Sequence, residues 1–498
     1  MADPRPGGGR AGDRRRPPRH SKVDASRLAA FDVLTAVREQ DAYTNLVLPP
    51  MLRARRISGR DAAFATELVS GTIRRQGTYD AVIAANVNRP LSKVDAAVLD
   101  ALRLGAHQIL AMRVPSHAAV GTTVDLVRER IGHGPSGFVN AVLRRIAAHD
   151  LSGWVRRVAP DPATDPIGFA AVAHSHPRWV VDELAAALDS SAVAPRGTPA
   201  SPQTNQSHEL AALLAADNAA PKVTLVARPG LVTVDELVAA GGRASTMSPY
   251  AVELPGGDPG EVPAVAEGRA GVQDEGSQLV ALGLAGASLD GQDERWLDMC
   301  AGPGGKSALL AAIAGERGAR LLASERLPHR AELVRSGTAT VAASGSGGLL
   351  GVVTADGTRP AWRAGSFDRV LVDAPCSGLG ALRRRPESRW RRTPSDLDDL
   401  VPLQRALLDV ALDSVRAGGV VAYATCSPVL AETSGVVCAA LDARSDVVLE
   451  DAAPLFDTVP DLYADRMALP GTVQLWPHRH NTDAMFFALL RRSWLRVP

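Results

Sequence analysis

Two short segments, DAPC (373–376) and TCS (425–427), place Cys376 and Cys426 in similar surroundings in the second half of this 498-residue chain. Each segment follows a short apolar run that predicts a strand. The carboxyl ends of neighbouring parallel strands meet at one edge of a sheet, so we expect both thiols to lie in one crevice. A thiolate is a very good nucleophile, and one of the two thiols could therefore attack an electron-poor carbon.

A pair of thiols suits methyl transfer to carbon 5 of a pyrimidine. That carbon is a poor nucleophile, but attack of a thiolate on carbon 6 turns the ring into an enamine, whose carbon 5 can take a methyl group. Asp373 beside ring nitrogen 3 would stabilise the adduct by hydrogen bonding or protonation. A base must then remove the carbon 5 proton, so one cysteine would attack and the other would serve product release. These residues alone leave open which cysteine does which.

The alternative is that the cysteines are small, buried hydrophobic residues. We adopt that interpretation for Cys300 and Cys438, which lack the matching surroundings. The four cysteines show no C-x-x-C spacing typical of zinc sites, and they are too few in so long a chain to predict a disulfide framework. We therefore expect no metal site, and reduced thiols in a cytoplasmic protein.

A glycine-rich segment, DMCAGPGGKS (298–307), lies upstream of the two cysteines. It is not the phosphate loop of nucleotide hydrolases, because that motif needs Gly at the position of Cys300. The glycine turn should open a helix whose free N–H groups can bind a carboxylate. Glu325, at the end of the next predicted strand, is placed to bind ribose hydroxyls, and Asp356, after the following strand, to accept a hydrogen bond from an adenine amino group.

These features together predict a nucleoside ligand with an amino-acid tail, namely S-adenosylmethionine. A generic strand–turn–helix with surface acids is the alternative interpretation. The predicted cofactor-binding residues are Cys300, Ala301, Gly302, Pro303, Gly304, Gly305, Lys306, Glu325, Asp356 and Asp373.

The elements that must position these residues alternate between strand and helix. We predict strands at RWLDMC, ARLLAS, GLLGVVTA, FDRVLVDA and GVVAYAT, with helices at KSALLAAIAG, HRAELVRSG and LQRALLDVALDSVRAGG. This order predicts an α/β, doubly wound, Rossmann-like domain with a mostly parallel sheet. Further upstream, residues 26–149 repeat apolar residues at three- and four-residue spacing, which predicts an all-α module of about six helices.

We predict four parts along the chain. A disordered basic arm spans 1–22, an all-α domain spans 23–152, a linker with a small α+β subdomain spans 160–265, and the Rossmann-like catalytic domain spans 266–498. A flexible insertion rich in Pro, Ser and Ala lies in the subdomain near 189–208.

Charge and composition limit the possible partners. The formal net charge is only +1, with 46% hydrophobic and 22% charged residues, so any nucleic-acid surface must be local. No apolar run approaches the roughly 18 residues of a membrane span. The first twenty residues hold six Arg against two Asp but lack the apolar core of a signal peptide. We therefore expect a soluble protein without membrane contact, and nothing in the chain predicts an obligate oligomer.

A second basic stretch, ALRRRPESRWRR (381–392), carries six Arg and one Glu directly after the loop of Cys376. Arginine contacts to phosphate and stacking on an aromatic ring suit an RNA strand whose target base is unpaired or flipped out. We predict RNA contacts for Arg384, Arg385 and Trp390. The alternative is a solvated arginine loop.

The combination of DMCAGPGGKS, LVDAPCSGLGALRRRPESRW, YATCSP and HNTDAMFF (480–487) resembles the Sun family of RNA cytosine-5 methyltransferases. The segments DAAFATELVSGTIRR and GFVNAVLRRI resemble the NusB-like RNA-binding domain that some branches carry, notably the branch that methylates small-subunit ribosomal RNA. The resemblance covers residues 25–490. It implies an S-adenosylmethionine-dependent enzyme that methylates carbon 5 of a cytosine, with 16S ribosomal RNA as the first expected substrate.

The resemblance also assigns roles to individual residues. It makes Cys426 the nucleophile, because the family attacks with the cysteine of its T-C-S motif, and gives Cys376 a part in release of the methylated base. Asp373 matches the acid that contacts the base, and Lys306 matches a lysine near the cofactor loop. The segment VQDEGSQ, with Gln273, Asp274 and Ser277, resembles the motif that precedes the methyl-donor site.

Two departures from the family pattern lie near the presumed substrate pocket. Thr433 follows Glu432 where the family often has Asn, and HNTDAMFF with Ala484 replaces a usual H-G-T-D-G-F-F. They bear on substrate preference more than on chemistry. Transfer RNA therefore stays open as the substrate, and a non-catalytic RNA-binding or ribosome assembly factor is the alternative from another class.

Overall fold

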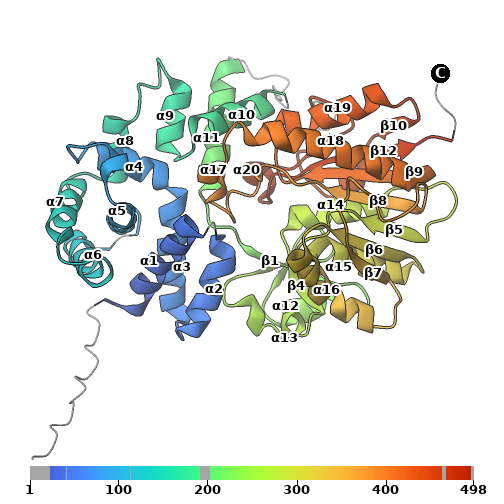
Figure 1. The fold of residues 1–498 in the computed structure, drawn as a ribbon, viewed down its shortest axis with the longest axis horizontal. Coiled ribbons are helices and arrows are strands. Elements are labelled where there is room, and N and C mark those ends of the chain that lie inside the picture. The colour runs from blue at the N-terminus through green and yellow to red at the C-terminus, as the bar shows by residue number, and fades with distance from the viewer. Residues whose placement is uncertain (1–22, 41, 113, 191–201, 463–466, 495–498) are drawn as a thin grey trace, which may run out of the picture.

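The computed structural model describes residues 23–40, 42–112, 114–190, 202–462 and 467–494. The chain forms an N-terminal helical unit, a helical connection, a small antiparallel sheet and a large, mostly parallel sheet (Figure 1). This arrangement confirms the predicted fold class. The arm predicted over 1–22, and residues 191–201 of the predicted insertion, lie outside the described residues.

The N-terminal unit packs its helices around one apolar core that includes Phe31, Leu68, Leu102 and Leu143. Aspartate N-caps start two of them, as where the Asp95 carboxylate accepts a hydrogen bond from the Val98 N–H at 3.1 Å. The described residues contain seven α-helices here, against about six predicted: α1 (Ala25–Glu39), α2 (Thr44–Ala54), α3 (Gly59–Arg74), α4 (Gln76–Ala84), α5 (Ala96–Leu110), α6 (Ser116–Arg130) and α7 (Ser136–Ile146).

The connection between the units is helical, where the sequence predicted a linker. Its helices are α8 (Leu151–Val158), α9 (Pro166–Ala173), α10 (Arg178–Asp189) and α11 (Pro202–Asp217). The predicted domain end at 152 therefore falls inside α8, and the end of the predicted insertion, 202–208, begins α11. The reason is packing: α10 and α11 bury Leu184 and Leu213 against Leu382 and Trp476 of the large-sheet unit.

The small sheet has the strand order β2-β3-β1-β4 and is antiparallel at every pairing. Its strands are β1 (Val223–Ala227), β2 (Arg243–Ala244), β3 (Ala251–Leu254) and β4 (Ala270–Val272), joined by α12 (Val234–Ala239) and α13 (Pro263–Ala266). The catalytic domain was predicted to begin at 266, but β4 pairs with β1 through Leu225 opposite Val272. The small unit therefore extends to residue 272.

The large sheet has the order β10-β12-β9-β8-β5-β6-β7, with β11 paired to β12. Its strands are β5 (Arg295–Asp298), β6 (Arg320–Glu325), β7 (Leu349–Thr354), β8 (Phe367–Asp373), β9 (Val415–Thr425), β10 (Val447–Glu450), β11 (Val473–Gln474) and β12 (Phe486–Arg492). The pairings from β9 to β7 are all parallel, and β12 runs antiparallel to β9. All five strands that the sequence predicted are present.

Helices cover both faces of this sheet because successive strand side chains point to opposite faces. Val370 and Val372 of β8 pack with α18 (Asp396–Ser414), while Leu371 between them packs on the other side with α14 (Glu275–Gly286) and α15 (Gly305–Glu316). The helices of this unit are α14 (Glu275–Gly286), α15 (Gly305–Glu316), α16 (Pro328–Ala343), α17 (Ser388–Arg391), α18 (Asp396–Ser414), α19 (Ser434–Ala443) and α20 (Pro477–His480). Buried on both faces, the strands read as continuous apolar runs in the sequence.

Residues 383–392, which we call the strap, join the large-sheet unit to the helical unit. Glu387 accepts hydrogen bonds from the backbone N–H and the hydroxyl of Thr44, both at 3.1 Å. The indole N–H of Trp390 donates to the carbonyl of Ile73 at 2.9 Å, and Arg391 donates to the carbonyl of Ala42 at 2.6 Å. The strap is therefore a structural joint between segments more than 300 residues apart in sequence.

Arg389 is the most buried side chain of the strap, with 0% of its surface exposed. Its guanidinium donates to the carbonyls of Ser175 and Asp217, both at 3.1 Å, and to the side-chain oxygen of Asn218 at 2.7 Å. Burying a charge is costly unless hydrogen bonds replace its hydration. The connection between the units thus supplies the oxygen atoms that allow this arginine to be buried.

Replacing Trp390 by Ala should loosen the joint. The change removes the Nε1 hydrogen bond to Ile73 and the packing of the ring against the helical core, at an expected cost of about 2 kcal/mol for a partly buried tryptophan. Thermal unfolding and hydrogen exchange of α3 and α4 would report the loss. Trp494→Ala is the matched control, because Trp494 is 68% exposed; equal behaviour of the two variants would contradict the role of the joint.

Candidate functional site

The two predicted thiols meet at the carboxyl edge of the large sheet. β8 and β9 pair in parallel with Asp373 opposite Ala424, so the loops that follow the two strands leave the sheet side by side. The Sγ atoms of Cys376 and Cys426 lie 3.4 Å apart, within hydrogen-bonding range of two sulfur atoms. Both side chains are partly exposed, so a molecule at this edge can reach them.

The surroundings of the two thiols differ in charge. The hydrogen bond from Cys376 lowers the pKa of Cys426, and the nearby cations Arg385 and Lys306 act in the same direction. The same hydrogen bond, burial and the charge of Glu432 raise the pKa of Cys376 well above its ordinary value. Cys426 is thus the thiol that loses its proton more readily, and Cys376 the one that keeps it.

Glu432 accepts hydrogen bonds from both cysteine loops. Its side chain is completely buried, and its Oε1 accepts a hydrogen bond from the Ser377 backbone N–H at 2.7 Å. Its Oε2 accepts from the hydroxyls of Ser377 at 2.5 Å and Ser427 at 2.6 Å. Gln404 donates to Oε1 at 3.0 Å and also to the carbonyl of Pro375 at 2.9 Å. One carboxylate therefore binds the residue after each cysteine.

A third segment crosses the two loops at Gly380. The Gly380 N–H donates to the carbonyl of Cys426, and its own carbonyl accepts from the N–H of Ala484, both at 2.9 Å. A Cβ atom at position 380 would lie 2.2 Å from the Ala484 oxygen and 2.8 Å from the Cys426 oxygen. Only glycine allows this approach of three backbones.

Asp373 and Lys306 connect the cysteines to the glycine-rich loop. The Lys306 ammonium donates to the Asp373 carboxylate at 2.9 Å and to the Ser277 hydroxyl at 3.2 Å. Burial lowers the pKa of Lys306, but the charge of Asp373 and the hydrogen bond to it more than compensate and raise that pKa. The site thus holds an ion pair between the loop that opens α15 and the end of β8.

The glycine-rich loop lies against the acid at the end of β6. The Gly302 N–H donates to Glu325 Oε2 at 3.0 Å, and the Leu327 N–H donates to Oε1 at 3.0 Å. A Cβ atom at position 302 would lie 2.2 Å from that Oε2. Beneath the loop, Asp298 accepts from the Ser307 hydroxyl at 2.6 Å, and burial raises the pKa of Asp298 to about 7.

The remaining loop residues differ in exposure and surroundings. Cys300 is partly exposed and packs with the apolar core beneath β8, and burial raises the pKa of its thiol well above the ordinary value. Ala301 is buried, Pro303 is exposed, and Gly304 and Gly305 open α15. Cys300 thus packs against the core of the sheet, and its part in cofactor binding stays a prediction.

These residues suit a nucleoside ligand with an amino-acid tail. The side-chain amide of Gln273 is buried beside Gly305 and makes no hydrogen bond within the described residues. A carboxylate or ammonium group of such a ligand would satisfy it. Asp356 follows β7, and one of its carboxylate oxygens accepts hydrogen bonds from the Thr358 N–H and hydroxyl. These hydrogen bonds lower the pKa of Asp356. These contacts support the predicted cofactor-binding residues.

The residues predicted to contact RNA separate into two groups. Trp390 is partly buried in the joint with the helical unit, where its indole N–H donates to the Ile73 carbonyl, so its stacking on an RNA base stays a prediction. Arg384 forms an ion pair with the buried Asp483. Burial and, to a lesser extent, the charge of Asp274 raise the pKa of Asp483 to about 6. Arg385 is exposed, and its guanidinium lies over the ring of Tyr43 at 5.4 Å. Of the three, Arg385 is best placed to meet a ligand.

Sequence reasoning missed the supporting residues Glu432, Gly380 and Asp483. Each acts through contacts with segments distant in the chain, as when the Asp483 N–H donates to Asp274 at 3.0 Å. A weak signal existed for Glu432: it is the only acid in the apolar segment between Cys426 and Val437. An acid in such a segment must find hydrogen-bond donors inside the protein.

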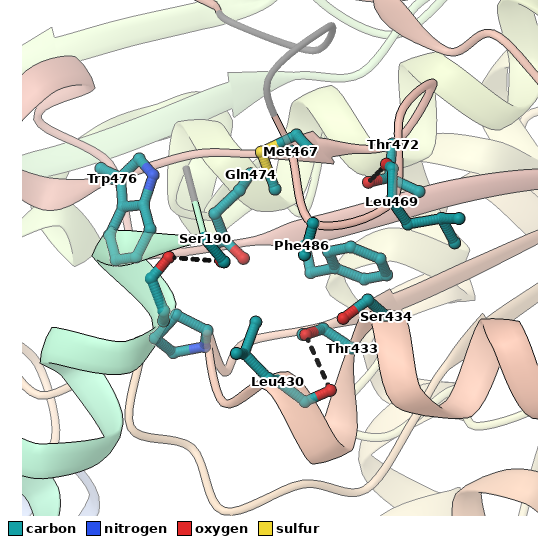
Figure 2. A pocket seen from close by; sticks show the side chains of 13 residues that line it. Ser190, Leu430, Thr433, Ser434, Met467, Leu469, Thr472, Gln474, Trp476 and Phe486 are labelled. Carbon is teal, nitrogen blue, oxygen red and sulfur yellow. Dashed lines mark hydrogen bonds between the residues drawn. The ribbon is translucent and has the colours of Figure 1, made fainter. Parts of the chain in front are cut away.

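A separate pocket is lined in part by the loop after Cys426. Leu430, Thr433, Trp476 and Phe486 are among the residues that line it, and Figure 2 shows the hydrogen bond from the Thr433 hydroxyl to the Leu430 carbonyl. The described residues that line it include no acid, base or thiol, and neither Cys376 nor Cys426 is among them. The departure at Thr433 belongs to the wall of this pocket.

In the part of the chain that the structure describes, no helix has the length and apolar character needed to cross a membrane. Within the same residues, no three or more His, Cys, Asp or Glu side chains are grouped so that they could hold a metal ion.

Comparisons with known proteins agree on one family. The family model described as "16S rRNA methyltransferase RsmB/F" matches residues 288–491, and the "NusB family" model matches residues 24–148. The "Putative methyltransferase Rv1407" of Mycobacterium tuberculosis (strain H37Rv) is 50% identical over 96% of this chain and 99% of its own length. The "Ribosomal RNA small subunit methyltransferase B" of Pseudomonas putida is 32% identical, with coverages of 83% and 88%.

A solved structure shares the whole fold. The crystal structure of PH0851 matches with a TM-score of 0.71 at 19% sequence identity. The match covers 93% of this chain and 97% of that chain, so the arrangement of helical unit, small sheet and large sheet recurs in it.

Replacing Gly380 by Ala should destabilise the protein by about 1–3 kcal/mol, because the added methyl group collides with two backbone oxygens that cannot move independently. The midpoint of chemical denaturation, followed by a probe in the large-sheet unit, measures the change. Gly351→Ala is the control, since a Cβ atom there meets nothing within 4 Å. A Gly380→Ala protein as stable as this control would show that the three backbones are not held as described.

Proposed function

This chain belongs to the 16S rRNA methyltransferase RsmB/F family, and on that premise we propose that it methylates carbon 5 of a cytosine in RNA with S-adenosylmethionine as donor. Small-subunit ribosomal RNA is the substrate that the relatives' names favour. The observation that carries the proposal is the pair of thiols 3.4 Å apart beside the Asp373–Lys306 ion pair.

Attack begins at Cys426. Its lowered pKa increases the fraction of Cys426 that is thiolate, and that sulfur forms a bond to carbon 6 of the flipped-out cytosine. The electron pair of the 5,6 double bond then enriches carbon 5, and charge builds at ring nitrogen 3. Asp373, at the end of β8 beside Lys306, would in its protonated form donate a hydrogen bond or its proton to this nitrogen and so stabilise the adduct.

The cofactor, when bound, supplies a methyl group on a positively charged sulfur that carbon 5 can take up. It would be held by the glycine loop, Lys306, Glu325, Asp356 and the unpaired side-chain amide of Gln273. Release then requires loss of the carbon 5 proton and cleavage of the bond between Cys426 and carbon 6, which restores the double bond. Cys376 is near enough to assist this elimination.

RNA would approach from the carboxyl edge of the sheet. Arg385 is exposed at this edge and close enough to Cys426 to lower its pKa, so it can meet the phosphate of the target nucleotide. The helical unit would provide a second contact. In this proposal the enzyme acts as a monomer in the cytoplasm, where thiols stay reduced.

The alternatives are the same reaction on transfer RNA and a non-catalytic assembly factor. One assay separates these alternatives from the proposal. It measures the transfer of a labelled methyl group to unmodified small-subunit ribosomal RNA and, in parallel, to transfer RNA. Transfer to neither RNA, by a protein that binds both, would favour the assembly factor and overturn the proposal.

Cys426→Ala should abolish both methylation and any covalent RNA adduct, because the attacking sulfur is gone. Cys376→Ala should instead accumulate an adduct that survives a denaturing gel, because attack continues while release stalls. Cys438→Ala is the control, since that cysteine lies on α19 outside the site. Normal methylation by Cys426→Ala would rule out the two-thiol mechanism.

Gly302→Ala should weaken S-adenosylmethionine binding by about tenfold or more, equivalent to about 1.4 kcal/mol. The new methyl group would displace Glu325, whose carboxylate lies 2.2 Å from its position. Calorimetric titration of the protein alone measures the affinity, with Gly351→Ala as the control. Unchanged affinity would place the cofactor away from this loop.

A further inference from the structure

We propose that Glu432 is a positioning residue that holds the two cysteine loops at hydrogen-bonding distance and so decides which thiol gives up its proton. The inference rests on the proposed function, since it explains how the cysteine pair is prepared for reaction. Glu432 touches neither thiol through a hydrogen bond that the structure describes; it acts through the serine that follows each cysteine.

The hydrogen bonds to the Glu432 carboxylate all run in one direction. All four groups bound to the Glu432 carboxylate are donors: the Ser377 N–H and hydroxyl, the Ser427 hydroxyl and the Gln404 amide. A carboxylate is the side chain that can accept so many at once, because it offers only acceptor sites. The two hydroxyls also lie 3.0 Å from each other, so the carboxylate draws them together.

The peptide chain links each of the two serines directly to one of the thiols. Each serine adjoins its cysteine, so a carboxylate that fixes both serines fixes the separation of the two sulfur atoms above them. Gln404, from the middle of α18, binds both Glu432 and the carbonyl of Pro375 and so anchors the cluster to the sheet. The hydroxyl of Tyr423 donates to the Glu432 carbonyl at 2.7 Å and holds its backbone.

Charge acts on the same pair. The Glu432 carboxylate raises the pKa of Cys376, after the hydrogen bond to Cys426, burial and the charge of Cys426. The cations Arg385 and Lys306 lower the pKa of Cys426, while burial and the charge of Asp373 oppose them. The charges of Glu432, Arg385 and Lys306 therefore favour keeping the proton on Cys376.

The test measures thiol reactivity without RNA or cofactor. Full-length protein is treated with iodoacetamide between pH 6 and 10, and the alkylation rates of Cys376 and Cys426 are followed by peptide mass spectrometry. Because each pKa unit changes the thiolate fraction about tenfold, we expect Cys426 to react at least about tenfold faster than Cys376 at pH 7. In Glu432→Gln, this ratio should fall to about threefold or less, because the amide meets its donors with an NH₂ group.

Controls separate positioning from general stability. Asp100→Asn removes another buried carboxylate, which accepts from Arg38 at 2.8 Å in the helical unit, and should lower the melting temperature while leaving the ratio unchanged. If Glu432→Gln does not fold, the double variant Ser377→Ala/Ser427→Ala keeps the carboxylate but removes both hydroxyl bridges. It should lower the ratio in the same direction.

The outcomes decide the proposal. A folded Glu432→Gln protein, or failing that a folded double-serine variant, with the wild-type ratio overturns it. A lowered ratio together with a lower kcat and an unchanged KM for S-adenosylmethionine supports it. Failure of the wild type to methylate any RNA would sink the proposed function instead, and the alkylation ratio would still report on Glu432.

Discussion

The parallel pairing of β8 with β9 is the constraint on which the site depends. Because the two strands run in the same direction and end level with each other, their loops emerge at one edge and bring two cysteines 50 residues apart within 3.4 Å. The acid at the end of β8 and the lysine of the glycine loop meet at the same edge. Right-handed crossings through α18 and the other helices are the usual way in which a chain makes such neighbours parallel.

Pairing of the strands brings the loops close, but the polar cluster beneath them determines their conformation. A carboxylate removed from water is unfavourable unless donors replace its hydration, and here uncharged donors from both loops and from α18 do so. The close crossing at Gly380 adds the segment before β12 to the same assembly. Four segments far apart in the chain are thus interdependent, and a disturbance in one would reach the reactive sulfur.

Much of this arrangement could be predicted from the sequence, because strand–helix alternation and the position of a residue at a strand end are local signals. The five parallel strands, the meeting of Cys376 with Cys426 and the position of the glycine loop follow from them. What could not be predicted depends on distant contacts. The strap resembles an exposed arginine-rich loop in sequence, yet Arg389 is buried by carbonyls from α11 and its surroundings. The Glu432 carboxylate likewise depends on four hydrogen-bond donors, three of which come from the distant residues Ser377 and Gln404.

The strap has a consequence for the order in which the protein assembles during synthesis. The helical unit leaves the ribosome first, and the residues that complete its joint, such as Glu387 with Thr44, follow 343 residues later. At typical bacterial elongation rates of about 5–20 residues per second, that delay is tens of seconds. The carbonyl of Ile73 and the hydroxyl of Thr44 must therefore be hydrated, or held by another partner, through most of translation. The two units can therefore dock only late in synthesis, after the loop that contains Cys376 has been made.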